Sequence, residues 1–146
     1  MTDRSLAHCV SALCDAPATD AFAYLADAER IGEWALGCWD ARLEEDDVVR
    51  GTSLFDGTAS FVRVRPAAES LTVDFEVGGD PDHLVRRIAA RVVGGDDLGG
   101  DPHRSLVILL AWRTESMNDD RWRRLTSSHD TEILMLRERI ERSASA

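Results

Sequence analysis

The chain has 146 residues, of which 44% are hydrophobic and 30% charged, a composition typical of a folded domain with a substantial core. Its formal net charge of −10 argues against nonspecific binding to nucleic acid or to an anionic membrane surface, because both require a positive patch. No apolar run approaches the ~18 residues of a membrane span, and the N-terminal residues MTDRSLAHCV lack the pattern of a signal peptide.

Residue composition also bears on the source of the protein and on its cellular compartment. All 17 basic residues are arginine, which indicates a GC-rich genome and fits a bacterial source. The three cysteines, Cys9, Cys14 and Cys38, form no CxxC pair, so we expect reduced thiols in a cytoplasmic protein. No phosphate loop, dinucleotide fingerprint or Ser-His-Asp motif occurs, and we expect no cofactor. We expect one domain over residues 1–146.

The first third of the chain predicts one strand and two helices. Apolar residues alternate along 5–14, as in a strand with one buried face. Pro17 suits the first turn of a helix over 17–27, because its missing N–H has no partner there in any case. A second short helix over 27–37 follows, and Gly37 is expected to end it.

From residue 38 onward the apolar period changes to two, which is typical of antiparallel strands. The predicted strands cover 38–45, 48–55, 58–65, 70–77, 83–93 and 105–115. Asp56-Gly57 predicts a tight hairpin, and the acidic residues 44–47 predict a solvated turn. The loop between the last two strands is rich in Gly and Asp, and we expect a hairpin connection there.

A single long helix is predicted over 118–142, with Asn118 or Asp119 as its N-cap. Its apolar stripe includes one histidine and runs through Trp122, Leu125, His129, Ile133, Leu136 and Ile140. The basic run RWRR at 121–124 is interpreted as a solvated helix face. A sheet cannot bury its inner face alone, so we expect this helix to cover it.

Residues 16–34 carry a pattern that, together with the order of elements, resembles the START/polyketide cyclase-like (SRPBCC) superfamily. The matching residues are Ala16-Pro17, Phe22-Ala23-Tyr24-Leu25 and Asp27-Ala28-Glu29-Arg30-Ile31-Gly32-Glu33-Trp34. The resemblance implies an α+β helix-grip fold, in which a curved seven-stranded antiparallel sheet wraps around a long C-terminal helix. It is specific for fold and weak for function, because the superfamily contains carriers, cyclases and dehydratases.

The same resemblance bears on the two tryptophans beside Gly37. It implies that Trp34 plugs one end of the curved sheet and that Trp39 begins the next strand, with Gly37 letting the chain reverse between them. Each ring either fills the core or lines a ligand pocket. Tyr24, the sole tyrosine, is a further candidate hydrogen-bond donor to a ligand, or is exposed on its helix.

His129 and Glu132 are the candidate catalytic pair, because residues three apart on a helix are neighbours. A histidine oriented by a carboxylate suits general acid–base catalysis. The alternative is a buried structural histidine that is hydrogen-bonded to Glu132 or to a strand. A metal site would need a third ligand, for which only His8 is available, so we expect none.

Two strand residues complete the candidate ligand site. Arg86 is the odd charge on an apolar face of strand 83–93, together with Leu84, Ile88, Ala90 and Val92. A buried guanidinium needs a partner, either an acid such as Glu132 or an oxygen of a ligand. The alternative to ligand contact is a plain salt bridge or a position at the end of the strand. Trp112 shares a face with Leu106, Ile108 and Leu110, and it either packs in the core or stacks on an aromatic ligand.

Three functions remain open at this point. The first is binding of a hydrophobic or aromatic small molecule between sheet and helix. The second is a polyketide cyclase- or dehydratase-like enzyme in which His129 is the base, Glu132 orients it and Arg86 stabilises an oxyanion. The third is an interaction module, such as a homodimer, with a filled cavity. It is suggested by a second apolar face on the last strand, formed by Val107, Leu109 and Ala111.

Overall fold

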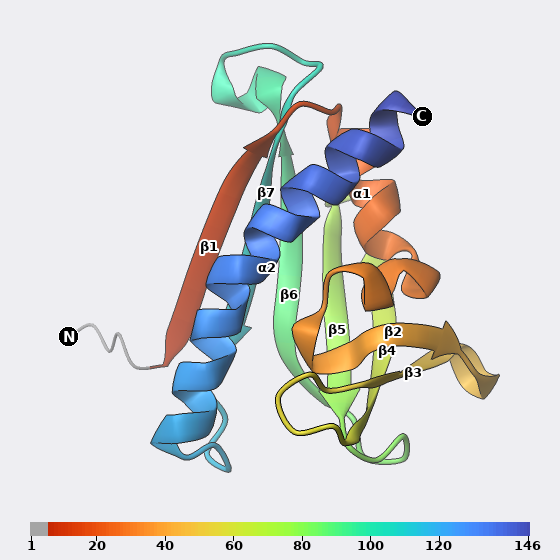
Figure 1. The fold of residues 1–146 in the computed structure, drawn as a ribbon. Coiled ribbons are helices and arrows are strands. Elements are labelled where there is room, and N and C mark those ends of the chain that lie inside the picture. The colour runs from red at the N-terminus through yellow and green to blue at the C-terminus, as the bar shows by residue number, and fades with distance from the viewer. Residues whose placement is uncertain (1–5) are drawn as a thin grey trace.

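The computed structural model describes residues 6–146, which form one seven-stranded antiparallel sheet curved around a long C-terminal helix (Figure 1). The spatial order of the strands is β1-β7-β6-β5-β4-β3-β2. The strands are β1 (Ala7–Cys14), β2 (Trp39–Leu43), β3 (Val48–Thr52), β4 (Ala59–Ala67), β5 (Thr72–Gly78), β6 (Val85–Gly94) and β7 (Ser105–Trp112). The α-helices are α1 (Ala18–Ala26) and α2 (Asp119–Ser145), and the short 3-10 helices are Ala28–Glu33, Leu36–Cys38, Glu45–Asp47 and Gly95–Leu98. The α+β helix-grip architecture expected from the sequence is therefore confirmed.

The residues between α1 and β2 differ in detail from the prediction of one short helix. They form two 3-10 helices, Ala28–Glu33 and Leu36–Cys38, and the side chain of Asp27 caps the first by accepting from the Glu29 N–H at 3.0 Å. Gly37 has no positive φ, so its expected role in reversing the chain is wrong. Gly32 is the position that requires glycine, because a Cβ there would collide with the backbone of Asp40 and Ala41 in β2.

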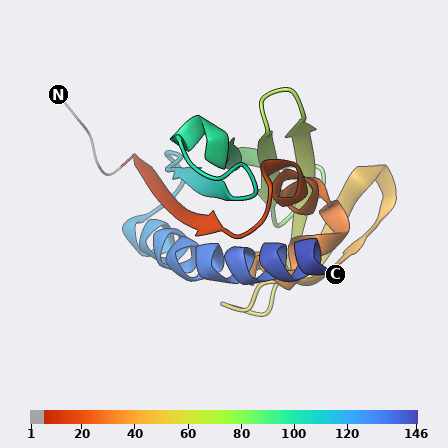
Figure 2. The same cartoon turned by 90° about the horizontal axis from the view of Figure 1, so that it is seen from above.

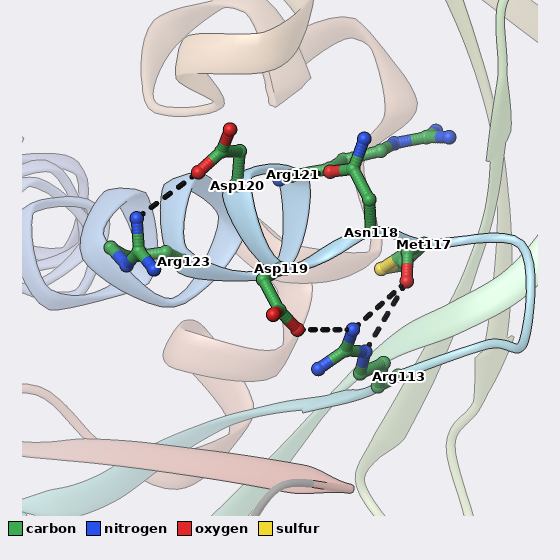
Figure 3. A network of polar contacts seen from close by, with 7 residues as sticks. All are labelled: Arg113, Met117, Asn118, Asp119, Asp120, Arg121 and Arg123. Atoms are coloured by element: carbon green, nitrogen blue, oxygen red, sulfur yellow. Dashed lines mark hydrogen bonds and ion pairs between the residues drawn. The ribbon is translucent and has the colours of Figure 1, made fainter.

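The start of α2 is fixed to the end of β7 by a network of polar contacts (Figure 3). The side chain of Asn118 accepts a hydrogen bond from the Arg121 N–H at 2.8 Å, as an N-cap should. The Arg113 guanidinium, just past β7, donates to the Met117 carbonyl at 3.1 Å and to the Asp119 carboxylate at 2.7 Å. These contacts set the direction in which the first turns of α2 present their side chains.

The core lies between α2 and the concave face of the sheet, and α2 runs along that face when the molecule is seen from above (Figure 2). On β7 the buried side chains are Val107, Leu109 and Ala111, whereas Trp112 is only partly buried. Trp112 therefore lies on the outer face with Leu106, Ile108 and Leu110, and the expectation that it faces inward is wrong. The argument for a dimer from the Val107 face also fails, because that face is the inner one.

Within residues 6–146, no helix combines the length and hydrophobicity that a membrane crossing requires.

Candidate ligand cavity

A cavity of about 430 Å3 lies between α2 and the sheet, within the range of small-molecule sites. Its wall is built from α2, β4, β5, β6, the β3–β4 loop and residues 31–38. The wall includes fully buried side chains such as Phe75 and exposed ones such as Phe55, which is 42% exposed. The cavity therefore reaches from the core to solvent beside the first turns of α2. It argues against the interaction module with a filled interior.

Aromatic rings form part of the buried end of the cavity. The ring of Trp34 meets the ring of Phe75 edge to face, with centroids 5.8 Å apart and an angle of 71° between planes. Trp34 is 4% exposed and lines the cavity, so it closes this end and also offers a surface to a guest. Such an edge-to-face pair adds about 0.5–1.5 kcal/mol beyond area burial.

His129 and Glu132 lie in the cavity wall on α2, and both are almost fully buried. Nε2 of His129 is 3.8 Å from Oε1 of Glu132, and Oε2 of Glu132 accepts a hydrogen bond from the Leu36 N–H at 2.8 Å. Among residues 6–146, Nδ1 of His129 is buried without a hydrogen-bond partner. The two side chains are thus close but not hydrogen-bonded to each other, and His129 retains a buried ring nitrogen that no described residue contacts by a hydrogen bond.

Burial changes the protonation of both groups. Burial lowers the pKa of His129 to about 4, with a smaller contribution from His8, while Asp130 opposes the change. Burial raises the pKa of Glu132 to about 7, and the hydrogen bond from the Leu36 N–H opposes this change. Near neutral pH the imidazole is therefore uncharged, and the carboxyl is close to its titration midpoint. Burial alone accounts for the opposite directions, because it disfavours the charged form of an acid and of a base alike.

Arg86 does not line the cavity, and the expected inward orientation of this residue is wrong. A β-bulge shifts the register of β5 and β6: Phe75 pairs with Ile88, whereas the next residue, Glu76, pairs with Arg86. The extra residue on β6 is Arg87, which lines the cavity in place of Arg86. Arg86 is 53% exposed and lies 3.6 Å from the Glu76 carboxylate, so the alternative of a plain salt bridge is the one observed.

The other predicted ligand residues are spread over the fold. Tyr24 is buried on α1, where its hydroxyl donates to Glu33 at 2.8 Å, and it is absent from the cavity wall. Trp39 begins β2, as expected, but does not line the cavity either. His8 lies 3.2 Å from Asp130 and is absent from the cavity wall. Over the described range 6–146, no group of three or more His, Cys, Asp or Glu side chains is placed to hold a metal ion.

Part of the cavity wall is basic, and the sequence did not reveal it. Arg121 and Arg124 of α2 are exposed, as expected for RWRR, and they also line the cavity with Arg87. Their helical spacing contained the signal, because Arg121, Arg124, Ser128, His129 and Glu132 follow one another at intervals of three or four, or as direct neighbours, along one face. Cys38, whose thiol donates to the Ser60 carbonyl, is a further wall residue that the sequence did not reveal.

Solved structures share this fold at low sequence identity. A protein from Bacillus thuringiensis is 12% identical, with a TM-score of 0.69 over 92% of this chain and 98% of that one. The Zhui aromatase/cyclase from Streptomyces sp. R1128 is 13% identical, with a TM-score of 0.67 over 93% of each chain. A START superfamily protein from Mycobacterium smegmatis is 14% identical, with a TM-score of 0.57 over 96% of this chain and 97% of that one.

No protein-family model and no curated protein matches the sequence itself. At 12–14% identity the structural likeness concerns fold and leaves function to the site. The likeness includes an aromatase/cyclase and a START superfamily protein, and in each case it extends over at least 92% of this chain. The chain therefore has the START/polyketide cyclase-like helix-grip fold.

Proposed function

We propose that the protein binds a hydrophobic or aromatic small molecule in the cavity between the sheet and α2. The observation that carries this proposal is an unfilled volume of about 430 Å3 whose buried end presents Trp34 and Phe75. An apolar pocket with a few convergent polar groups is the usual form of a small-molecule site. In this interpretation His129 and Glu132 face the guest as its polar contacts.

The proposal is tested by filling the cavity from one of its strands. Ile88 lines the cavity on β6, and Ile88→Trp places a large ring in it. Ile108→Trp is the matched control, because Ile108 is partly buried on the outer face of the neighbouring strand β7. Binding of the neutral fluorescent probe N-phenyl-1-naphthylamine is expected for the wild type and Ile108→Trp, and to be lost in Ile88→Trp.

Native mass spectrometry of the purified protein supplies an independent test, since a tight natural ligand co-purifies. Circular dichroism establishes that both tryptophan variants are folded. If the wild type does not bind the neutral probe, or if Ile88→Trp binds it as well as the control does, the proposal is wrong.

A second candidate function, acid–base catalysis of the cyclase or dehydratase type, is favoured by the Glu132 carboxyl. A buried carboxyl with a pKa of about 7 in the wall of a cavity is poised to exchange a proton at neutral pH. Since the pKa of His129 is lowered to about 4, the Glu132 carboxylate is the stronger base of the two. In this assignment Glu132 removes the proton and the neutral His129 holds a polar group of the guest.

The aromatic carbon acid 5-nitrobenzisoxazole tests this second candidate. Transfer of its C3 proton to Glu132 and cleavage of its N–O bond give the coloured 2-cyano-4-nitrophenolate with no other reactant. We expect a rate above the buffer reaction that rises through pH 7 and is lost in Glu132→Gln. Glu138→Gln, on the exposed face of α2, is the matched control and is expected to react like the wild type. A rate equal in both variants would exclude Glu132 as a base toward a guest in the cavity.

A further inference from the structure

Three arginines, Arg87, Arg121 and Arg124, line one cavity in a chain whose formal net charge is −10. Arg87 comes from β6, and the other two come from the first turns of α2. Positive charge gathered in the wall of a cavity, against the balance of the whole chain, attracts and holds an anion.

Arg87 carries the strongest part of this observation. Its side chain is half-buried, and its Nε is buried with no hydrogen-bond partner among residues 6–146. Burial, with a smaller contribution from the charge of Arg121, lowers the pKa of Arg87 to about 10, so the two guanidinium groups act on each other. A buried N–H without a partner carries a free-energy penalty that an acceptor on a ligand would remove.

The nearby carboxylates are engaged by other arginines. Glu76, beside the bulge, forms ion pairs with Arg63, Arg65 and Arg86 at 3.2–3.6 Å. Within the described part of the chain, Arg87 forms no ion pair. Because of the bulge, two successive arginines lie in different places: Arg86 joins the surface ion pairs, and Arg87 lines the cavity.

The carboxylates at the start of α2 are likewise paired with arginines that do not line the cavity. Asp119 pairs with Arg113 at 2.7 Å, and Asp120 pairs with Arg123 at 3.1 Å. Figure 3 shows that the Arg121 side chain extends away from both of these carboxylates. Arg121 is exposed and lines the cavity, so it lies toward the solvent side of the site.

Arg124 and Asp56 complete this part of the wall. The Arg124 guanidinium lies over the ring of Phe55, 5.1 Å from its centroid. Asp56 is the acid of this loop that lines the cavity, and its carboxylate accepts hydrogen bonds from the N–H and the hydroxyl of Thr58. Asp56 and the partly ionised Glu132 are the two carboxyl groups of the wall, and three arginines against them leave it net positive.

We propose that the natural guest is an amphipathic anion, whose carboxylate or phosphate is held by Arg87 and Arg121 while its apolar body lies against Trp34 and Phe75. This inference rests on the proposed function, since it requires that the cavity binds a small molecule. It adds the chemical class of the guest and its orientation: apolar end in the core, charged end toward solvent.

Competition among three naphthalenes of matched shape tests the charge requirement. The reporter is the neutral N-phenyl-1-naphthylamine, and the competitors are 1-naphthol, 1-naphthoate and 1-naphthyl phosphate. For the wild type, at least one anion is expected to displace the reporter at a concentration about tenfold lower than 1-naphthol does, because charge-assisted hydrogen bonds are the stronger ones. The better anion of the two distinguishes a carboxylate guest from a phosphate guest.

Substitution of single arginines tests which of them cause the preference for an anion. Arg87→Gln and Arg121→Gln are each expected to reduce the preference for the anion over 1-naphthol to about twofold or less, with both competitors measured against the reporter affinity of the same variant. Arg86→Gln and Arg123→Gln remove neighbouring surface charges and are expected to keep the preference.

The outcomes separate the two proposals. If the reporter binds but 1-naphthol competes as well as the anions, or if the preference survives in both cavity variants, the anionic guest is excluded and the apolar cavity stands. If the reporter does not bind the wild type at all, the proposed function itself fails.

Discussion

The Oε2 atom of Glu132 accepts a hydrogen bond from the backbone N–H of Leu36 at 2.8 Å, which joins the middle of α2 to the segment that precedes β2. The other carboxylate oxygen lies 3.8 Å from Nε2 of His129. Glu132 is therefore both a structural link and a titratable group of the cavity wall. Its two roles can be separated by substitution, because glutamine keeps an oxygen that accepts from Leu36.

Replacement of Glu132 by glutamine is expected to change how stability depends on pH. The pKa of Glu132 is about 7 in the folded protein and about 4.5 when unfolded, so its contribution to stability is full below pH 4.5 and is lost as the pH rises to 7. The free energy of unfolding of Glu132→Gln, relative to wild type, is therefore expected to rise by about 3 kcal/mol between pH 4 and pH 8.

Urea unfolding at a series of pH values measures this difference. Glu138→Gln provides the control, because Glu138 is exposed and paired with Arg142 at the surface. A difference between Glu132→Gln and wild type that does not change with pH would show that the Glu132 pKa is ordinary.

Replacement of His129 by glutamine is expected to act in the opposite direction. The pKa of His129 falls from 6.5 to about 4 on folding, so its contribution is full above pH 6.5 and is lost as the pH falls to 4. The stability of wild type relative to His129→Gln is expected to decrease by about 3 kcal/mol between pH 7 and pH 4. Titration of the imidazole by NMR measures the pKa directly, and a midpoint near 6.5 would contradict the prediction. The exposed His103 is the internal reference.

Gly32 and Gly37 are expected to respond differently to alanine. A Cβ at Gly32 would lie 2.9 Å from backbone atoms of Asp40 and would also collide with Ala41, whereas a Cβ at Gly37 would meet nothing within 4 Å. Gly32→Ala should destabilise the protein by at least about 2 kcal/mol, because the neighbouring backbone cannot move aside cheaply. Gly37→Ala should be neutral or stabilise by up to about 1 kcal/mol. Thermal unfolding of the two variants side by side decides the matter, and equal losses would contradict the observed packing.

The thiol of Cys38 is expected to report whether the cavity is occupied. It lines the cavity and is buried, and burial raises its pKa, so alkylation should be slow but measurable. Saturating N-phenyl-1-naphthylamine should slow the reaction of Cys38 with iodoacetamide further. Exposed Cys9 should react at the same rate with and without the probe, which provides an internal control, and peptide mass spectrometry follows both sites. A Cys38 rate that the probe does not affect would place the probe elsewhere.

The sequence predicted most of the fold because hydrophobic period and turn residues are local signals. The strand over 70–77 shows this well, since Val73, Phe75 and Val77 are buried as their alternation predicts. The strand over 105–115 does not, because residues of both its faces are apolar. Alternation then identifies two faces without saying which one meets the helix, and Trp112 was placed on the wrong side for this reason.

The candidate site was less accessible to sequence reasoning, and Arg86 shows the physical cause. The alternation of side chains between the two faces of a strand can be followed only while the strand pairing is regular. The bulge at Arg87 adds one residue, and no Gly or Pro marks it in the sequence. His129 and Glu132, in contrast, were placed correctly beside each other, because a helix with no kink preserves its spacing over many turns. The position of Leu36 against Glu132 depends on tertiary packing alone, and no local pattern encodes it.

The attachments of α2 are unequal on its two sides. His8 and the backbone of Asp15 bind it through Asp130 and Glu141, so one flank of the helix is fastened along the β1 margin. The opposite flank borders empty volume beside β4 and β5. The wall that α2 gives to the cavity is therefore braced from behind by the first strand of the sheet.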